Sequence, residues 1–144
     1  MNNQLRNDLT HIVSEVNGHL GVIEFESLPF PPKRFFWLKG VDGDATRADH
    51  AHRTCHQLLV CQQGFVTATI TSVHGEVSIH EMQMGSTIHL MPLHWLELTK
   101  FSANSVLGVF ASEPYKLDEY ITNKEELLEL WRHEHKLGIK FEIQ

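Results

Sequence analysis

Residues 47–64 read RADHAHRTCHQLLVCQQG, the stretch of this chain that indicates most about its fold and chemistry. His50 and His52 are separated by one residue. On an extended strand their side chains point to the same face, because side chains alternate with a period of two. Gln57 then begins an apolar run. A strand that carries two neighbouring imidazoles into the mouth of a barrel is suited either to bind a metal ion or to move protons near neutral pH.

The size and charge of the chain limit its class. A length of 144 residues fits a single domain over residues 1–144 with its own core. The formal net charge of -6 argues against nucleic acid as a partner, because phosphate binding needs a basic face. The chain has no apolar run that could cross a membrane and no signal-peptide pattern, so we expect a cytoplasmic protein without a membrane partner. Cys55 and Cys61 are expected to be reduced and buried.

Short strand signals dominate the sequence. Alternating or apolar runs between turn residues predict nine or ten strands, which comprise the histidine stretch and residues 10–16, 19–25, 33–39, 57–61, 65–71, 76–82, 86–90, 95–99 and 105–111. The first two runs form a hairpin through Asn17-Gly18, a strong signal for a tight turn. A hairpin of this kind can add to the edge of a partner's sheet, so we expect a homodimer.

Only the C-terminal part has a helical pattern. Asn123 followed by Glu126 has the form of an N-cap with a reciprocating carboxylate in the first turn. An apolar stripe follows, made of Leu127, Leu128, Leu130 and Trp131. These features predict a helix over about residues 123–137. Many short strands and one terminal helix predict an all-β fold, a jelly-roll β-barrel with a short C-terminal α-helix.

The spacing of the histidines to later glycines and a proline resembles the two half-motifs of cupins. The first half-motif usually reads His-x-His, then glutamate after three or four residues, then glycine after six more. The corresponding positions of this chain are His50, His52, Gln57 and Gly64. The second half-motif, here with Gly85 and Pro92, normally has a histidine five residues after the proline, where this chain has Glu97.

Glutamine in place of glutamate at Gln57, and glutamate in place of histidine at Glu97, resemble the pattern of one branch of the cupins, the WxcM-like nucleotide-sugar 3,4-ketoisomerases. That family has an Arg-Gly-aromatic-His-Ala-His stretch followed by a strand like Gln-Val-Leu-Val-Cys, and this chain has RADHAH at 47–52 and QLLVC at 57–61. Lys33-Arg34 before aromatic residues and ASEPYKLDEYI at 111–121 also match, so the resemblance covers roughly residues 12–130. The chain departs from the family pattern at Phe36, Trp37, Ala48, Asp49, His56 and Leu96.

The resemblance implies an isomerase without a metal or other cofactor. Its substrate would be a dTDP-linked 4-keto-6-deoxy sugar, whose carbonyl moves from carbon 4 to carbon 3 in a bacterial pathway for surface-polysaccharide sugars. On this interpretation His50 and His52 are catalytic, because a histidine with a pKa near the working pH suits such proton transfers. The substrate-binding candidates are Arg34, Arg47, Gln57 and Glu97, with Glu97 expected to point inward.

The same residues also fit two other classes of protein. His50, His52 and Glu97 would also make a two-histidine, one-carboxylate set for iron, nickel or manganese, as in a metal-dependent cupin enzyme. The departures from the family pattern are equally compatible with a sugar-nucleotide-binding cupin that has no catalytic activity. A 3,5-epimerase is a weaker option, because its usual tyrosine acid has candidates only at Tyr115 and Tyr120, near the C-terminal end.

Overall fold

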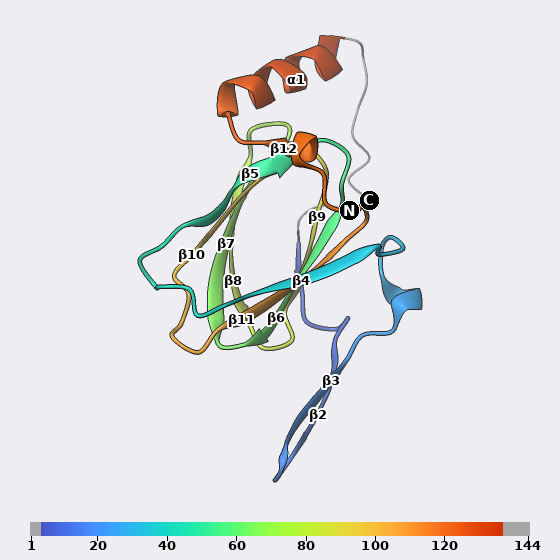
Figure 1. The fold of residues 1–144 in the computed structure, drawn as a ribbon, viewed down its shortest axis with the longest axis vertical. Helices are drawn as coiled ribbons and strands as arrows, with labels where there is room; N and C mark the ends of the chain where they lie inside the picture. The colour runs from blue at the N-terminus through green and yellow to red at the C-terminus, as the bar shows by residue number, and fades with distance from the viewer. Residues whose placement is uncertain (1–3, 137–144) are drawn as a thin grey trace.

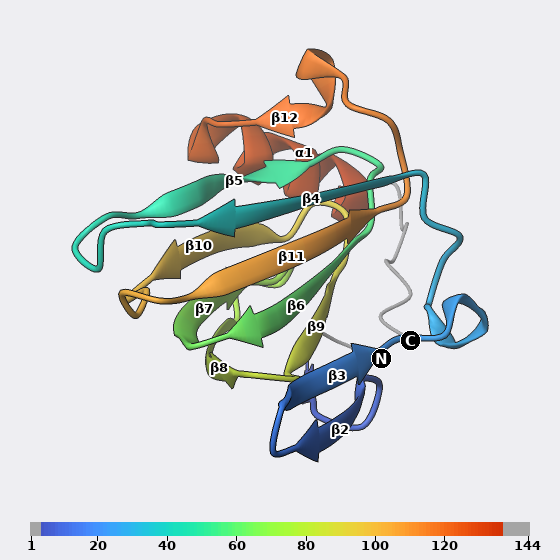
Figure 2. The same cartoon turned by 60° about the horizontal axis from the view of Figure 1, so that its bottom comes forward.

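The computed structural model of the protein describes residues 4–136. Two five-stranded antiparallel sheets face each other (Figures 1 and 2). The first sheet has the strand order β1 (Leu5–Arg6), β9 (Thr87–Leu90), β6 (Gln57–Gln63), β11 (Val106–Ala111), β4 (Arg34–Lys39). The second has the order β12 (Tyr120–Ile121), β5 (Arg47–His52), β10 (Trp95–Thr99), β7 (Phe65–Thr71), β8 (Val77–Gln83). The all-β fold predicted from the sequence is therefore confirmed.

The remaining elements lie at the two ends of this body. A separate hairpin of β2 (His11–Glu15) and β3 (Gly18–Val22) extends away from the sheets, opposite the helix α1 (Lys124–Lys136) (Figure 1). Two short 3-10 helices are η1 (Phe25–Ser27) and η2 (Leu117–Glu119). Leu127 and Trp131 of α1 pack on Ala51 and Ile121, which closes that end of the sheets with apolar contacts. Within residues 4–136 no helix is long and apolar enough to cross a membrane.

The main core lies between the two sheets and follows from strand alternation. In β7, Val66, Ala68 and Ile70 are buried in this core, and threonines occupy the positions between them. Leu107 and Val109 of β11 enter the same core from the opposite sheet. Burial of each large aliphatic side chain stabilises the fold by about 1.5–3 kcal/mol. Cys55 and Cys61 are both free and buried, as expected.

Two local predictions differ from the structure. The hairpin turn consists of Val16 and Asn17, because Glu15 pairs with Gly18. Asn123 caps α1 as predicted, since its Oδ1 accepts hydrogen bonds from the backbone N–H groups of Glu125 at 2.7 Å and Glu126 at 3.3 Å. The Glu126 carboxylate, however, accepts a hydrogen bond from Arg53 in place of the expected return to Asn123. The predicted helix end at residue 137 lies outside the described residues.

Gly64, the glycine of the first half-motif, is required by its backbone. It joins β6 to β7 with φ of +73°, and a Cβ there would lie 2.9 Å from Cα of Ser105. We expect Gly64→Ala to lower the free energy of unfolding by about 2–4 kcal/mol, through left-handed strain and a clash with backbone. Gly75→Ala is the control, because φ is +79° but no atom lies within 4 Å of the added Cβ. Urea unfolding that gives equal losses for both variants would contradict this explanation.

Candidate active site

A β-bulge in β5 sets the direction of the histidine pair. On the neighbouring strand β10, Leu96 pairs with His50 and the next residue pairs with Ala48, so Asp49 is the extra residue. Ala48 and Asp49 have φ of 67° and 57°, a left-handed conformation that is costly for residues other than glycine. The Asp49 carboxylate accepts a hydrogen bond of 3.2 Å from the indole of Trp95. The strand therefore carries local strain directly before the first candidate catalytic residue.

His50 and His52 share one face of β5 and contact each other. Their Nε2 atoms are 3.2 Å apart, and their rings meet nearly at right angles with centroids 4.9 Å apart. Nδ1 of His50 lies 2.8 Å from the carbonyl oxygen of Ala48. Since a carbonyl only accepts, this contact places the proton on Nδ1 of His50 and leaves a lone pair on its Nε2. His52 then donates from Nε2 to that lone pair.

Burial keeps both imidazoles neutral at physiological pH. Burial lowers the pKa of His50, although the hydrogen bond to Ala48 and the charge of Asp49 act in the opposite direction. Burial also lowers the pKa of His52 to about 4, assisted by His50 and Arg34 and opposed by Glu119. His50 is thus a neutral base whose ring is oriented by a backbone carbonyl and whose Nε2 lone pair, in the free protein, points at His52.

An internal cavity of about 260 Å³ lies between the sheets beside this pair. His50, Gln57, Arg47 and Tyr120 contribute polar groups to its wall, which is otherwise mostly aliphatic. His52 is only 2% exposed and lies behind His50. A ligand in this cavity would therefore meet His50 first. A second cavity of about 280 Å³, between the hairpin and the outer face of the first sheet, contains neither histidine of the pair.

The two candidate arginines lie at different places. Arg47 is on the cavity wall. The guanidinium of Arg34 lies between two aromatic rings, with its Cζ 5.1 Å from the centroid of Phe36 and 5.7 Å from that of Tyr115. The Nε atom of Arg34 is buried and has no hydrogen-bond partner among the described residues. Because β4 and β5 run in opposite directions, the two arginines begin their strands at opposite ends of the barrel (Figure 2).

The inward orientation expected for Glu97 is wrong. Its neighbours Leu96 and Leu98 line the cavity, and alternation along β10 turns Glu97 to the other face. There its carboxylate lies 3.9 Å from the ammonium of Lys124 in α1. The proposed set of His50, His52 and Glu97 is therefore not assembled. Among residues 4–136, no group of three or more His, Cys, Asp or Glu side chains is arranged to hold a metal ion.

Tyr120 and Glu119 are site residues outside the catalytic and substrate-binding set expected from the sequence, where Tyr120 was considered only as the acid of an epimerase. The Tyr120 ring lines the cavity, with its centroid 5.0 Å from that of His50 and 4.6 Å from that of His52. Tyr120 lies beside the two histidines because β12 pairs with β5, with Tyr120 opposite His52. The sequence feature that could have identified them is the stretch at 111–121, which matches the family pattern and contains both residues.

A double-sheet barrel with paired histidines beside its internal cavity defines the protein as a cupin. The profile of the family described as "FdtA: WxcM-like, C-terminal" matches residues 1–132. The chain therefore belongs to the WxcM-like family.

Characterised proteins similar to this chain include sugar isomerases. One is the TDP-4-oxo-6-deoxy-alpha-D-glucose-3,4-oxoisomerase of Aneurinibacillus thermoaerophilus, 27% identical over 112 residues that cover 76% of this chain and 79% of that protein. Another is the 3,4-ketoisomerase QdtA from Thermoanaerobacterium thermosaccharolyticum in complex with TDP, with 31% identity, a TM-score of 0.82 and coverage of 92% of this chain and 96% of that chain. A variant of QdtA in complex with TDP-4-keto-6-deoxyglucose has 30% identity, a TM-score of 0.82 and coverage of 92% and 95%.

Proposed function

We propose that the protein is a TDP-sugar 3,4-ketoisomerase that moves the carbonyl of a TDP-4-keto-6-deoxyhexose from carbon 4 to carbon 3. The observation that carries this proposal is the His50 imidazole, which lies on the cavity wall with its Nδ1 held by the carbonyl of Ala48. This arrangement leaves Nε2 as a neutral, oriented base. The related isomerases supply the substrate class, since one binds TDP-4-keto-6-deoxyglucose in a structure of the same fold.

The reaction needs only proton transfers. Nε2 of His50 takes the proton from carbon 3, and the electrons of that C–H bond form a double bond between carbons 3 and 4. The former carbonyl oxygen at carbon 4 takes the charge, giving an enediolate. The hydroxyl proton of oxygen 3 then passes to oxygen 4, and His50 returns its proton to carbon 4 as the carbonyl forms at carbon 3. In the free protein the Nε2–H of His52 donates to the lone pair of His50, so this hydrogen bond must break before His50 acts as the base, and the released N–H then donates to the enediolate.

The polar groups around the cavity fit the parts of this substrate. We assign the diphosphate to Arg34, because its buried Nε has no partner within the described residues and a guanidinium binds phosphate oxygens through paired hydrogen bonds. Arg47 and Gln57 reach the cavity itself, so we assign them to the sugar and its developing negative charge. Glu97 has no place in this assignment, because it faces Lys124.

The direct test is product analysis with protein treated with a chelator. The protein is incubated with TDP-4-keto-6-deoxyglucose, and a 3-keto product is trapped by an aminotransferase as the 3-amino sugar. The proposal expects trapped product at an undiminished rate after chelation. Loss of activity that a divalent metal restores would favour the metal-dependent class. A 4-keto sugar inverted at carbon 3 or 5 would identify an epimerase, and binding without any turnover would indicate a binding protein.

We also propose that the protein forms a homodimer through its hairpin. The β2–β3 hairpin pairs with no other strand of the described chain and exposes Val13 and Leu20. The strand β4 is a sheet edge whose outer face exposes Phe35 and Trp37. A second copy could cover both apolar surfaces by adding its hairpin to that edge. Analytical ultracentrifugation should give twice the chain mass for wild type and the single mass for Trp37→Glu, whereas a monomeric wild-type protein would contradict this proposal.

A further inference from the structure

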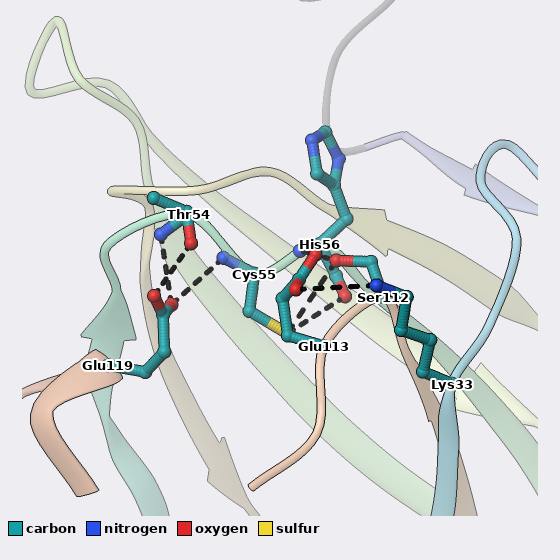
Figure 3. A network of polar contacts seen from close by, with 7 residues as sticks. All are labelled: Lys33, Thr54, Cys55, His56, Ser112, Glu113 and Glu119. Carbon is teal, nitrogen blue, oxygen red and sulfur yellow. Dashed lines mark hydrogen bonds and ion pairs between the residues drawn. The ribbon is translucent and has the colours of Figure 1, made fainter. Parts of the chain in front are cut away.

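The carboxylate of Glu119 joins two segments that are far apart in the sequence (Figure 3). One oxygen accepts hydrogen bonds of 2.9 Å from the backbone N–H groups of Thr54 and Cys55. The other accepts a hydrogen bond of 2.6 Å from the Thr54 hydroxyl. The backbone carbonyl of Glu119 also accepts from the N–H of Arg53 at 3.0 Å. The turn that follows the histidine strand is therefore fixed to the segment η2–β12.

This connection lies directly beside the catalytic pair. Thr54 follows His52 by two residues, and Tyr120 follows Glu119. The strand β12 is only two residues long and pairs with β5 alone, through Tyr120 with His52 and Ile121 with Ala51. So short an edge strand has few backbone hydrogen bonds of its own to hold it. The Glu119 carboxylate thus supplies much of the polar attachment that keeps the Tyr120 ring against both imidazoles.

The charge of Glu119 also acts on this pair. Partial burial raises the pKa of Glu119, but the hydrogen bonds from Thr54 and Cys55 outweigh it, so the pKa lies below its ordinary value and the carboxylate is ionised. Its charge raises the pKa of His52, against burial and the charges of His50 and Arg34. Removal of the carboxylate would change both the position of Tyr120 and the electrostatics of His52.

We propose that Glu119 is a positioning residue of the isomerase, which acts through Tyr120 by holding its ring against His50 and His52. His50 is then packed on one side and held by the Ala48 carbonyl on the other, so that the orientation of its ring is fixed. Small displacements of a catalytic base lower turnover strongly, because proton transfer depends on the approach of the reacting atoms. The inference rests on the proposed 3,4-ketoisomerase activity and adds a residue to it.

The test compares two replacements of Glu119. We expect Glu119→Ala to lower kcat by about 10- to 100-fold while KM changes less than threefold, as for a misplaced catalytic group. Glu119→Gln should retain most of the turnover, because its amide oxygen can accept from Thr54 and Cys55 and its amide nitrogen can donate to the Thr54 hydroxyl. Glu113→Ala is the matched control, since Glu113 lies in the same C-terminal segment but pairs with Lys33 at 3.9 Å (Figure 3).

A double-mutant cycle separates this role from general stabilisation. If Glu119 acts through Tyr120, then Glu119→Ala should lower kcat no further in a Tyr120→Ala background. Thermal unfolding of each variant shows that the comparison is made on folded protein. A Glu119→Ala variant that turns over within twofold of wild type, or one whose loss multiplies fully with that of Tyr120→Ala, would overturn the inference.

Ring nitrogen NMR gives a readout that does not need turnover. The Nε2 signals of His50 and His52 should report one dominant tautomer in wild type and in Glu119→Gln, and a mixture in Glu119→Ala. Identical spectra for all three proteins would overturn the inference even if the wild type is inactive on TDP-4-keto-6-deoxyglucose. Absence of wild-type turnover contradicts the proposed function alone.

Discussion

His50→Asn is expected to lower kcat by about 10²- to 10⁴-fold with little change in KM, as for the loss of a general base. The asparagine amide can still donate to the carbonyl of Ala48, which His50 contacts at 2.8 Å. It has no basic nitrogen to replace Nε2, so the proton on carbon 3 of the substrate has no acceptor. Steady-state kinetics with the aminotransferase-coupled assay measures the loss.

The control for this variant is a histidine-to-asparagine substitution at an exposed position. His74→Asn alters a histidine on the turn between β7 and β8, away from the cavity wall, and should leave kcat unchanged. Turnover of His50→Asn within about threefold of wild type would end the assignment of His50 as the base, because general-base catalysis contributes far more than that.

The second large effect expected is loss of stability in mild acid. His52 and His94 are 2% and 0% exposed, and burial above all lowers the pKa of each to about 4. In the unfolded chain a histidine titrates near 6.5. Between these values the unfolded chain binds protons that the native protein does not, so stability is full above about pH 6.5 and falls toward pH 4. From pH 7.5 to 5 the two residues together should lower the free energy of unfolding by roughly 3–5 kcal/mol.

Urea unfolding at the two pH values measures this change. His52→Gln removes one buried titrating group, so its stability should fall about 2 kcal/mol less than that of the wild type between pH 7.5 and 5. His133→Gln removes an exposed histidine of α1 and should keep the wild-type difference. If His52→Gln showed the same pH dependence as the wild type, burial of His52 in its neutral form would be disproved.

The strands predicted from periodicity agree with the structure where the runs are long. Residues 65–71 and 95–99 were predicted as strands and are β7 (Phe65–Thr71) and β10 (Trp95–Thr99). The two-residue strands β1 and β12 were not predicted, because periodicity cannot appear over two residues. Strand β12 matters most, since it carries Tyr120 to the histidine pair. Its place depends on pairing with β5, a long-range contact that local sequence does not encode.

The site was predicted in part for similar reasons. Alternation correctly placed His50 and His52 on one face, because the two residues lie beyond the bulge at Asp49. Alternation did not reveal that His50 lines the cavity while His52 lies behind it, which depends on tertiary packing around β5, including the Tyr120 ring. The inward orientation of Glu97 was inferred from the half-motif, whereas Leu96 and Leu98 on either side favour an outward carboxylate. Apolar neighbours decided the orientation here, because burial of an unpaired carboxylate is costly.

The most direct test of proton transfer by His50 is to follow the hydrogen atoms of the sugar ring during turnover in D2O. Wild-type protein should form the 3-keto sugar with deuterium at carbon 4, to the extent that the proton on His50 exchanges with solvent before it returns to the sugar. His50→Asn should form neither the product nor the label. A 3-keto product formed by His50→Asn at the wild-type rate, or deuterium found only at carbon 5 of an unshifted 4-keto sugar, would contradict proton transfer by His50.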